Sequence, residues 1–94
     1  MDAPTDFEWD DGTASANEAK HGVSFDVAMD VFRDPRRRVS SDDRRDYGEE
    51  RFTTLGAVGT TCLAVVFTMR GGTVRIISAR RANRRERRLY EGGT

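Results

Sequence analysis

The chain has 94 residues, a length that suits one domain rather than two. Its content of 36% hydrophobic and 34% charged residues indicates a thin core under a very polar surface, which favours a shallow charged site over a deep apolar cavity. There is no run of about 18 apolar residues and no signal-peptide pattern, so we expect a cytoplasmic protein. The single cysteine, Cys62, excludes a disulfide framework, and we expect it in the core.

The formal net charge is zero, but the charge is distributed unevenly along the chain. Residues 1–50 contain 14 acidic and 7 basic residues, whereas residues 51–94 contain 9 arginines and only 2 glutamates. We therefore expect the basic half to bind phosphates, and the acidic half to repel them or to meet a basic partner. Arginine suits phosphate because its planar fork makes two hydrogen bonds, although a GC-rich genome would produce the same bias over lysine.

The N-terminal segment predicts a short strand and a helix. After a flexible lead over residues 1–6, residues 7–9 alternate apolar and polar side chains, as a strand does. Asp10 or Asp11 is placed to cap a helix over Thr13–Lys20, because its carboxylate accepts the unpaired amide hydrogens of the first turn. Gly22 is placed to end that helix in a left-handed conformation.

A second helix and an edge strand follow. Ser24 is a candidate cap, and the apolar side chains between Phe25 and Phe32 recur at i, i+3, i+4 and i+7, which predicts one apolar helical face. Asp34 precedes a proline and avoids helical angles, so the helix should stop there. Residues 36–41 fit an edge strand, and residues 42–48 a polar turn.

Three strands and a final helix complete the pattern. The runs Arg51–Leu55, Cys62–Phe67 and Thr73–Ala79 are separated by short glycine-containing breaks, which predicts an antiparallel meander. Asn83 and Glu86 have the spacing of a capping box, so a short helix should run through Tyr90, followed by a flexible tail over residues 92–94. The element order β-α-α-β-β-β-β-α predicts a single α+β domain over residues 1–94. We expect an antiparallel sheet of four to five strands with two N-terminal helices and one C-terminal helix.

Side-chain alternation along the third run divides its arginines between two faces. An unbroken strand places Val74, Ile76, Ser78 and Arg80 on one face, and Arg75, Ile77 and Ala79 on the other. Arg75 and Arg80 would then converge on one ligand only if the strand bends or ends between them.

Several strings of residues, in a fixed order, carry a resemblance to a known family. They are Phe7-Glu8-Trp9-Asp10, Asn17, Lys20-His21-Gly22-Val23-Ser24-Phe25, Asp34-Pro35, Gly48-Glu49-Glu50-Arg51-Phe52, Leu55-Gly56 and Arg75-Ile76-Ile77-Ser78-Ala79-Arg80, then Glu86 and Tyr90. Over residues 7–91 the chain resembles the BrnT toxins of BrnT–BrnA toxin–antitoxin pairs. One departure is Thr13, where the family usually has a lysine that would help to hold RNA.

The resemblance implies a RelE-like fold and a toxin that cleaves RNA without a metal or other cofactor and so inhibits translation. It also implies neutralisation by a BrnA-type antitoxin, a ribbon-helix-helix protein that would bridge toxin copies as a dimer or tetramer. Operator DNA would be bound only through that antitoxin, and the complex would repress its own operon.

Metal-independent cleavage of RNA requires a base for the 2′-OH, an acid for the leaving 5′ oxygen, and cations for the developing charge. The candidates for these catalytic roles are Arg80, Glu49, Glu50, His21 and Arg51. The candidates for RNA binding are Lys20, Arg70, Arg75, Arg84, Arg85, Arg88 and Tyr90. Each has a structural alternative: surface ion pairs for the arginines, a charged strand start for the glutamates, a helix C-cap for His21, and core packing for Tyr90.

Two rival functions remain open at this level. An Arg-rich terminal helix also fits a DNA-binding module, although no helix-turn-helix pattern accompanies it. An inactive relative that only binds its antitoxin is the second rival, and Thr13 supports it. Specific duplex binding would favour the first rival, and growth arrest on expression would argue against the second.

Overall fold

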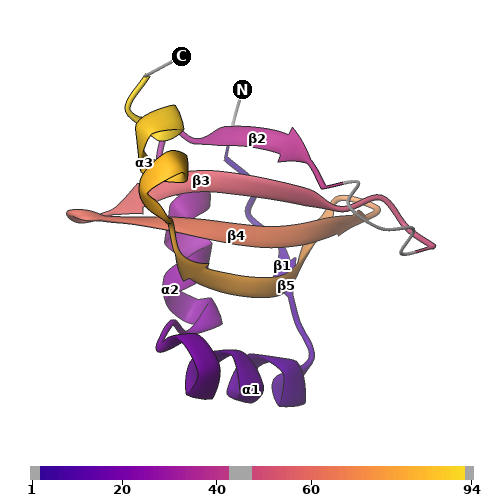
Figure 1. Ribbon diagram of the computed structural model, residues 1–94. Helices are drawn as coiled ribbons and strands as arrows, with labels where there is room; N and C mark the ends of the chain where they lie inside the picture. The colour runs from indigo at the N-terminus through magenta and orange to yellow at the C-terminus, as the bar shows by residue number, and fades with distance from the viewer. Residues whose placement is uncertain (1–2, 43–47, 93–94) are drawn as a thin grey trace.

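The structure is a computed structural model that describes residues 3–42 and 48–92 (Figure 1). A five-stranded sheet separates two helices on one face from one helix on the other (Figure 1). The strands are β1 (Phe7–Glu8), β2 (Arg38–Ser41), β3 (Phe52–Val58), β4 (Thr61–Arg70) and β5 (Thr73–Arg81), in the order β1-β5-β4-β3-β2. The helices are α1 (Asp11–His21), α2 (Phe25–Met29), which continues into the 3-10 turn η1 (Asp30–Arg33), and α3 (Arg84–Tyr90).

The predicted α+β class and element order are confirmed, with one difference in strand direction. Strands β2 to β5 form the expected antiparallel meander, but β1 pairs with β5 in parallel, so the sheet is mixed. Parallel pairing is possible because the long connection through α1 and α2 lets the chain return to the sheet in either direction. The predicted polar turn falls mostly on residues 43–47, and the predicted flexible ends partly on residues 1–2 and 93–94, all outside the described residues.

Capping residues define the helices where the sequence predicts them. The Asp10 carboxylate accepts a hydrogen bond from the Thr13 amide at 2.8 Å and begins α1. Gly22 ends α1 with φ of 71°, a left-handed conformation that costs glycine little. Ser24 Oγ accepts from the Val27 amide at 3.1 Å and begins α2. No helix in the described part of the chain is long and apolar enough to cross a membrane.

The core lies between the sheet and the layer formed by α1, α2 and η1. Phe25, Phe32 and Phe67 are buried in it, and the partly buried Phe7 and Trp9 pack against it. Gly56 allows η1 to lie directly on β3, because a Cβ at this position would stand 2.7 Å from Val31 Cγ1. The expectation for Cys62 is wrong: it is only partly buried and lies on the opposite sheet face, near Glu86 of α3.

A buried asparagine joins α1 to the edge of β5. Strand β1 pairs with β5 only at Val74 and Arg75, so no strand within residues 3–42 and 48–92 lies beside the later part of that edge. There Asn17, which is 7% exposed, donates from Nδ2 to the Ala79 carbonyl at 2.9 Å and accepts from the Ala79 amide at 3.0 Å. Its Nδ2 also donates to the Val23 carbonyl at 3.0 Å. One side chain therefore takes the place of a neighbouring strand residue.

A β-bulge in β5 overturns the predicted alternation of its side chains. Val66 of β4 pairs with Ser78, but the next residue, Phe67, pairs with Ile76, so Ile77 is an extra residue. As a result both Ile76 and Ala79 face the core, although they are three positions apart. Arg80 therefore shares a face with Arg75 instead of opposing it.

Helix α3 covers one end of the other sheet face and is held mainly by polar contacts. The predicted capping box is present: Asn83 Oδ1 accepts from the Glu86 amide at 2.8 Å, and Glu86 Oε1 accepts from the Asn83 amide at 2.9 Å. None of the residues of α3 is fully buried. Its carbonyl at Leu89 accepts from Arg38 of β2, and Tyr90 Oη donates to Asp34.

Candidate functional site

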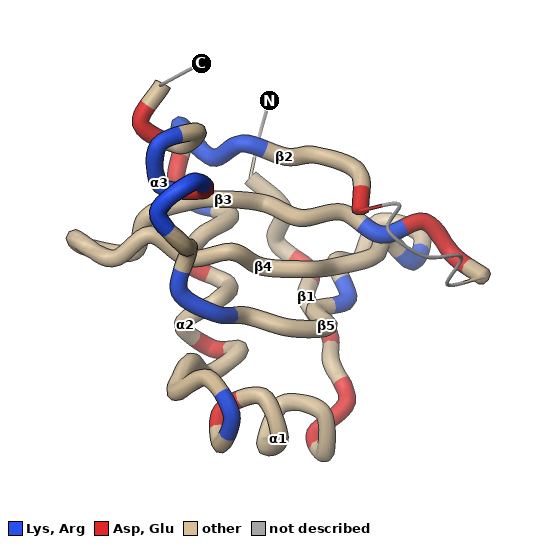
Figure 2. Tube along the Cα trace, viewed as in Figure 1, with Lys and Arg blue, Asp and Glu red and all other residues tan. Residues whose placement is uncertain are grey.

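The two faces of the sheet differ in charge. Side chains of β4 that face the core, such as Phe67, alternate with those on the opposite face, such as Thr68. The strand register places Arg38, Arg70, Arg75 and Arg80 on that opposite face, and alternation from the core-facing Phe52 adds the preceding Arg51; we call this the arginine face. Figure 2 shows basic segments along α3, the end of β5 and the start of β2; acidic segments lie on α1 and α2 and also on α3 and before β3.

Arg80 is held by a carboxylate of α3. Its Nη1 donates to Glu86 Oε1 at 2.7 Å and its Nη2 donates to Glu86 Oε2 at 2.9 Å, a two-pronged ion pair. The hydrogen bonds from Arg80, followed by the Asn83 amide, hold the pKa of the Glu86 carboxyl below its usual value despite partial burial. Glu86 is therefore ionised at neutral pH, and the orientation of the guanidinium is tied to α3.

Arg75 lies further along the same face and pairs with the neighbouring strand. Its Nη1 donates to Glu8 Oε2 of β1 at 2.7 Å, directly across the parallel pairing of the two residues. The bulge at Ile77 is what brings Arg75 and Arg80 to one face, where both can approach the same extended polyanion.

At the start of β3, one glutamate and two arginines form a cluster. Glu49 lies between two guanidinium groups, with Arg51 Nε 3.4 Å from Oε2 and Arg70 Nη2 3.7 Å from Oε1. The backbone carbonyl of Glu50 accepts from Thr68 Oγ1 at 2.6 Å, which ties the segment to β4. Glu49 and Glu50 line a shallow depression of about 240 Å³.

This cluster and Arg80 occupy opposite ends of the arginine face. Arg80 pairs with Ala64, which pairs with Leu55, and Leu55 lies four residues after Arg51. At about 3.3 Å per residue, the two positions are roughly 13 Å apart along the strands. The two groups therefore share a face but cannot act on the same phosphate.

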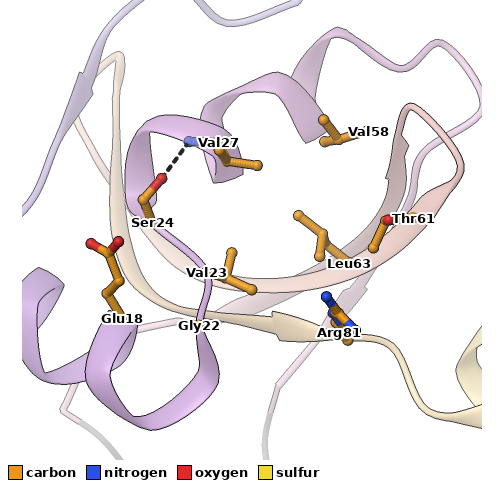
Figure 3. A pocket seen from close by; sticks show the side chains of 9 residues that line it. All are labelled: Glu18, Gly22, Val23, Ser24, Val27, Val58, Thr61, Leu63 and Arg81. Atoms are coloured by element: carbon orange, nitrogen blue, oxygen red, sulfur yellow. Dashed lines mark hydrogen bonds between the residues drawn. The ribbon is translucent and has the colours of Figure 1, made fainter.

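His21 and Lys20 are not brought to this face. Both lie in the last turn of α1, which belongs to the layer on the core side of the sheet (Figure 1). Near that turn, a cavity of about 350 Å³ has an apolar floor of Val23, Val58 and Leu63 (Figure 3). It is separate from the arginine face, because Arg81, which lines it, pairs with the core-facing Leu63.

The remaining basic candidates lie on α3. Arg84, Arg85 and Arg88 are exposed to solvent. Tyr90 is half-buried, with its hydroxyl bonded to Asp34 and the Arg36 guanidinium carbon 5.9 Å from its ring centroid. The hydrogen bond to Asp34 is the main cause of the raised pKa of the Tyr90 hydroxyl.

Sequence reasoning missed some of the residues that hold these arginines. Glu8 and Glu86 are the carboxylate partners of Arg75 and Arg80, and Arg38 binds the end of α3. The capping-box spacing marked Glu86 as a helix residue, but it carried no information about Arg80, which the fold brings to its side chain.

The described residues contain no cluster of three or more His, Cys, Asp or Glu side chains suited to hold a metal ion. No curated protein sequence matches the chain. A family model described as the ribonuclease toxin BrnT of type II toxin–antitoxin systems matches residues 9–86, from Trp9 in the core to Glu86 on α3. The chain therefore belongs to the BrnT family of ribonuclease toxins of type II toxin–antitoxin systems.

Proposed function

We propose that this toxin is a metal-independent endoribonuclease that binds single-stranded RNA across the arginine face. The observation that carries the proposal is that Arg51, Arg75 and Arg80 lie on one face, spread over about 13 Å and each held by a glutamate. The ribose 2′-OH would lose its proton as it attacks the adjacent phosphate, and the 5′ oxygen would take up a proton as it leaves, which gives a 2′,3′-cyclic phosphate and a free 5′-OH. Fixed guanidinium groups would stabilise the charge that develops on the phosphate.

We place the reacting phosphate at Arg80, because its guanidinium is held at two atoms by a carboxylate that is itself fixed. A donor that is already oriented stabilises a transition state without further reorganisation. Arg75 and the cluster of Glu49, Arg51 and Arg70 would then bind neighbouring phosphates, with Glu49 orienting the two arginines. The exposed arginines of α3 would extend the contact.

The opposite end offers an alternative position for the chemistry. There Glu49 would serve as the base, with Arg51 as the cation, and Glu50 close by. The variants Arg80→Ala and Glu49→Gln distinguish the two positions. If the reacting phosphate lies at Arg80, the first variant should lower kcat strongly and the second should leave kcat nearly unchanged; the reverse would move the site to Glu49.

We propose a BrnA-type ribbon-helix-helix antitoxin as the protein partner, which would cover the arginine face and block entry of RNA. Toxin copies would be bridged by an antitoxin dimer or tetramer, and the complex would repress its operon through the antitoxin. Membership in a type II family supports a protein as the antitoxin. The exposure of Arg84 on α3 supports this side of the sheet as the surface that the antitoxin binds. Arg84→Glu should weaken antitoxin binding, whereas unchanged affinity would remove this surface from the proposal.

The decisive experiment is cleavage of a labelled single-stranded RNA by the purified protein in EDTA. Arg80→Ala should cleave the RNA far more slowly, at a rate that is still measurable, while circular dichroism shows an intact fold. A matched control is Arg33→Ala, since Arg33 is an exposed arginine of η1 on the other side of the sheet. RNA affinity should fall steeply with salt. RNA binding without cleavage by the wild type would favour a non-catalytic binding protein.

A further inference from the structure

We infer that Glu86 is a positioning residue, which sets the orientation of Arg80 toward the reacting phosphate and does so from α3. The inference rests on the proposed function, because it assigns the reacting phosphate to Arg80. Glu86 would not contact RNA; it would act through the guanidinium that it holds.

The carboxylate of Glu86 is fixed at both oxygens. Oε1 accepts from Arg80 at 2.7 Å and from the Asn83 amide at 2.9 Å, and Oε2 accepts from Arg80 at 2.9 Å. An ordinary surface ion pair joins two flexible side chains and contributes little order. Here the capping box holds the Glu86 carboxylate against the helix backbone. The two hydrogen bonds between this carboxylate and the Arg80 guanidinium therefore fix the orientation of Arg80 as well.

The exposure of the two side chains also supports a role in which Glu86 acts through Arg80. The Glu86 side chain is 15% exposed and that of Arg80 35%, so Arg80 is the more accessible of the two. A phosphate approaching this end of the arginine face would therefore meet the guanidinium before the carboxylate.

The charge of Glu86 makes this role separable from binding. A negative charge beside Arg80 weakens the attraction between the arginine face and RNA, so it cannot serve affinity. What it can supply is a fixed donor geometry, which lowers the energy of the transition state more than that of bound substrate. Removing the charge should therefore move kcat and RNA affinity in different directions.

The test is Glu86→Gln, with Glu91→Gln as the matched control. Glutamine at this position still supports a capping box, so α3 should remain folded. Glu91 lies at the end of the same helix and is exposed, so its substitution makes the same change in net charge. Single-turnover cleavage and equilibrium binding of labelled RNA give kcat and Kd. We expect kcat of Glu86→Gln to fall at least about 10-fold with Kd unchanged or lower, and Glu91→Gln to cleave like wild type.

A double-mutant cycle decides whether Glu86 acts through Arg80. In the Arg80→Ala background, Glu86→Gln should cause no further loss of kcat. An unchanged kcat for Glu86→Gln alone, or an equal further loss in the Arg80→Ala background, would overturn the inference. Full cleavage by Arg80→Ala would instead refute the proposed position of the reaction, and with it this inference.

Discussion

Replacement of Asn17 by alanine should strongly destabilise the protein. Asn17 makes three hydrogen bonds through its side chain amide, two to the backbone of Ala79 and one to the carbonyl of Val23. Each is worth about 1 kcal/mol, and alanine recovers about 0.6 kcal/mol through its better helix propensity. We therefore expect the free energy of unfolding to fall by about 2–3 kcal/mol, which corresponds to roughly 10–20 °C in Tm for a domain of this size.

Urea unfolding followed by circular dichroism measures this effect, and Ser15→Ala is the matched control. Ser15 lies on the exposed face of the same helix, so its replacement should raise stability by about 0.5 kcal/mol through propensity alone. A loss below about 1 kcal/mol for Asn17→Ala would mean that water replaces the side chain at the edge of β5. The Asn17 side chain would then not be needed in the place of a neighbouring strand residue.

Asn17→Asp provides an independent check on the same contacts. The aspartate can still accept from the Ala79 amide, but its carboxylate would face two carbonyl oxygens where the amide donated. Both this repulsion and burial should raise the pKa of the new carboxyl in the folded state. The variant should therefore regain stability as the pH falls through that raised pKa, whereas Asn17→Ala should not.

Three further predictions concern stability. Tyr90→Phe should lower the free energy of unfolding by about 1–2 kcal/mol, because it removes the hydrogen bond to Asp34 that joins α3 to the loop after η1; thermal melting measures it, and an unchanged Tm would contradict it. Gly56→Ala should cost about 1–3 kcal/mol, since its Cβ would overlap Val31; a neutral result in urea unfolding would show that η1 shifts freely. The pKa values of Asp34 and Glu86 are lowered in the folded protein. Each carboxylate therefore stabilises the fold fully at pH values above its pKa in the unfolded chain, which is near 4, and this stabilisation is lost as the pH falls through the lower pKa of the folded protein. Tm measured from pH 6 to pH 2.5 should drop at the acid end, and less so for Glu86→Gln than for wild type.

The local structure of this protein could be predicted from its sequence, because the signals that define it act over a few residues. Asp10, Ser24 and Asn83 each bond to an amide three residues ahead, and each begins a helix as expected. The apolar spacing likewise predicted the core face of α2, and the glycine-containing breaks predicted the meander. The charge asymmetry predicted a basic surface from the second half of the chain.

The arrangement of the candidate site could not be predicted, because it depends on pairings between distant segments. Alternation along β5 indicates two faces, but the extra residue at Ile77 exists only relative to β4, so the common face of Arg75 and Arg80 is a consequence of register. His21 was grouped with these arginines by residue chemistry, yet the sheet lies between their layers.

The sequence by itself determined which segments form helices and strands, where the helices begin, and which half of the chain is basic. Those properties follow from short-range hydrogen bonds, side-chain periodicity and charge, all of which depend on residues that are close together in the sequence. Only the tertiary structure decided that Glu86 holds Arg80 and that Asn17 completes the edge of β5. Such contacts depend on how a helix is placed against a sheet, and packing and strand register fix that placement for the chain as a whole.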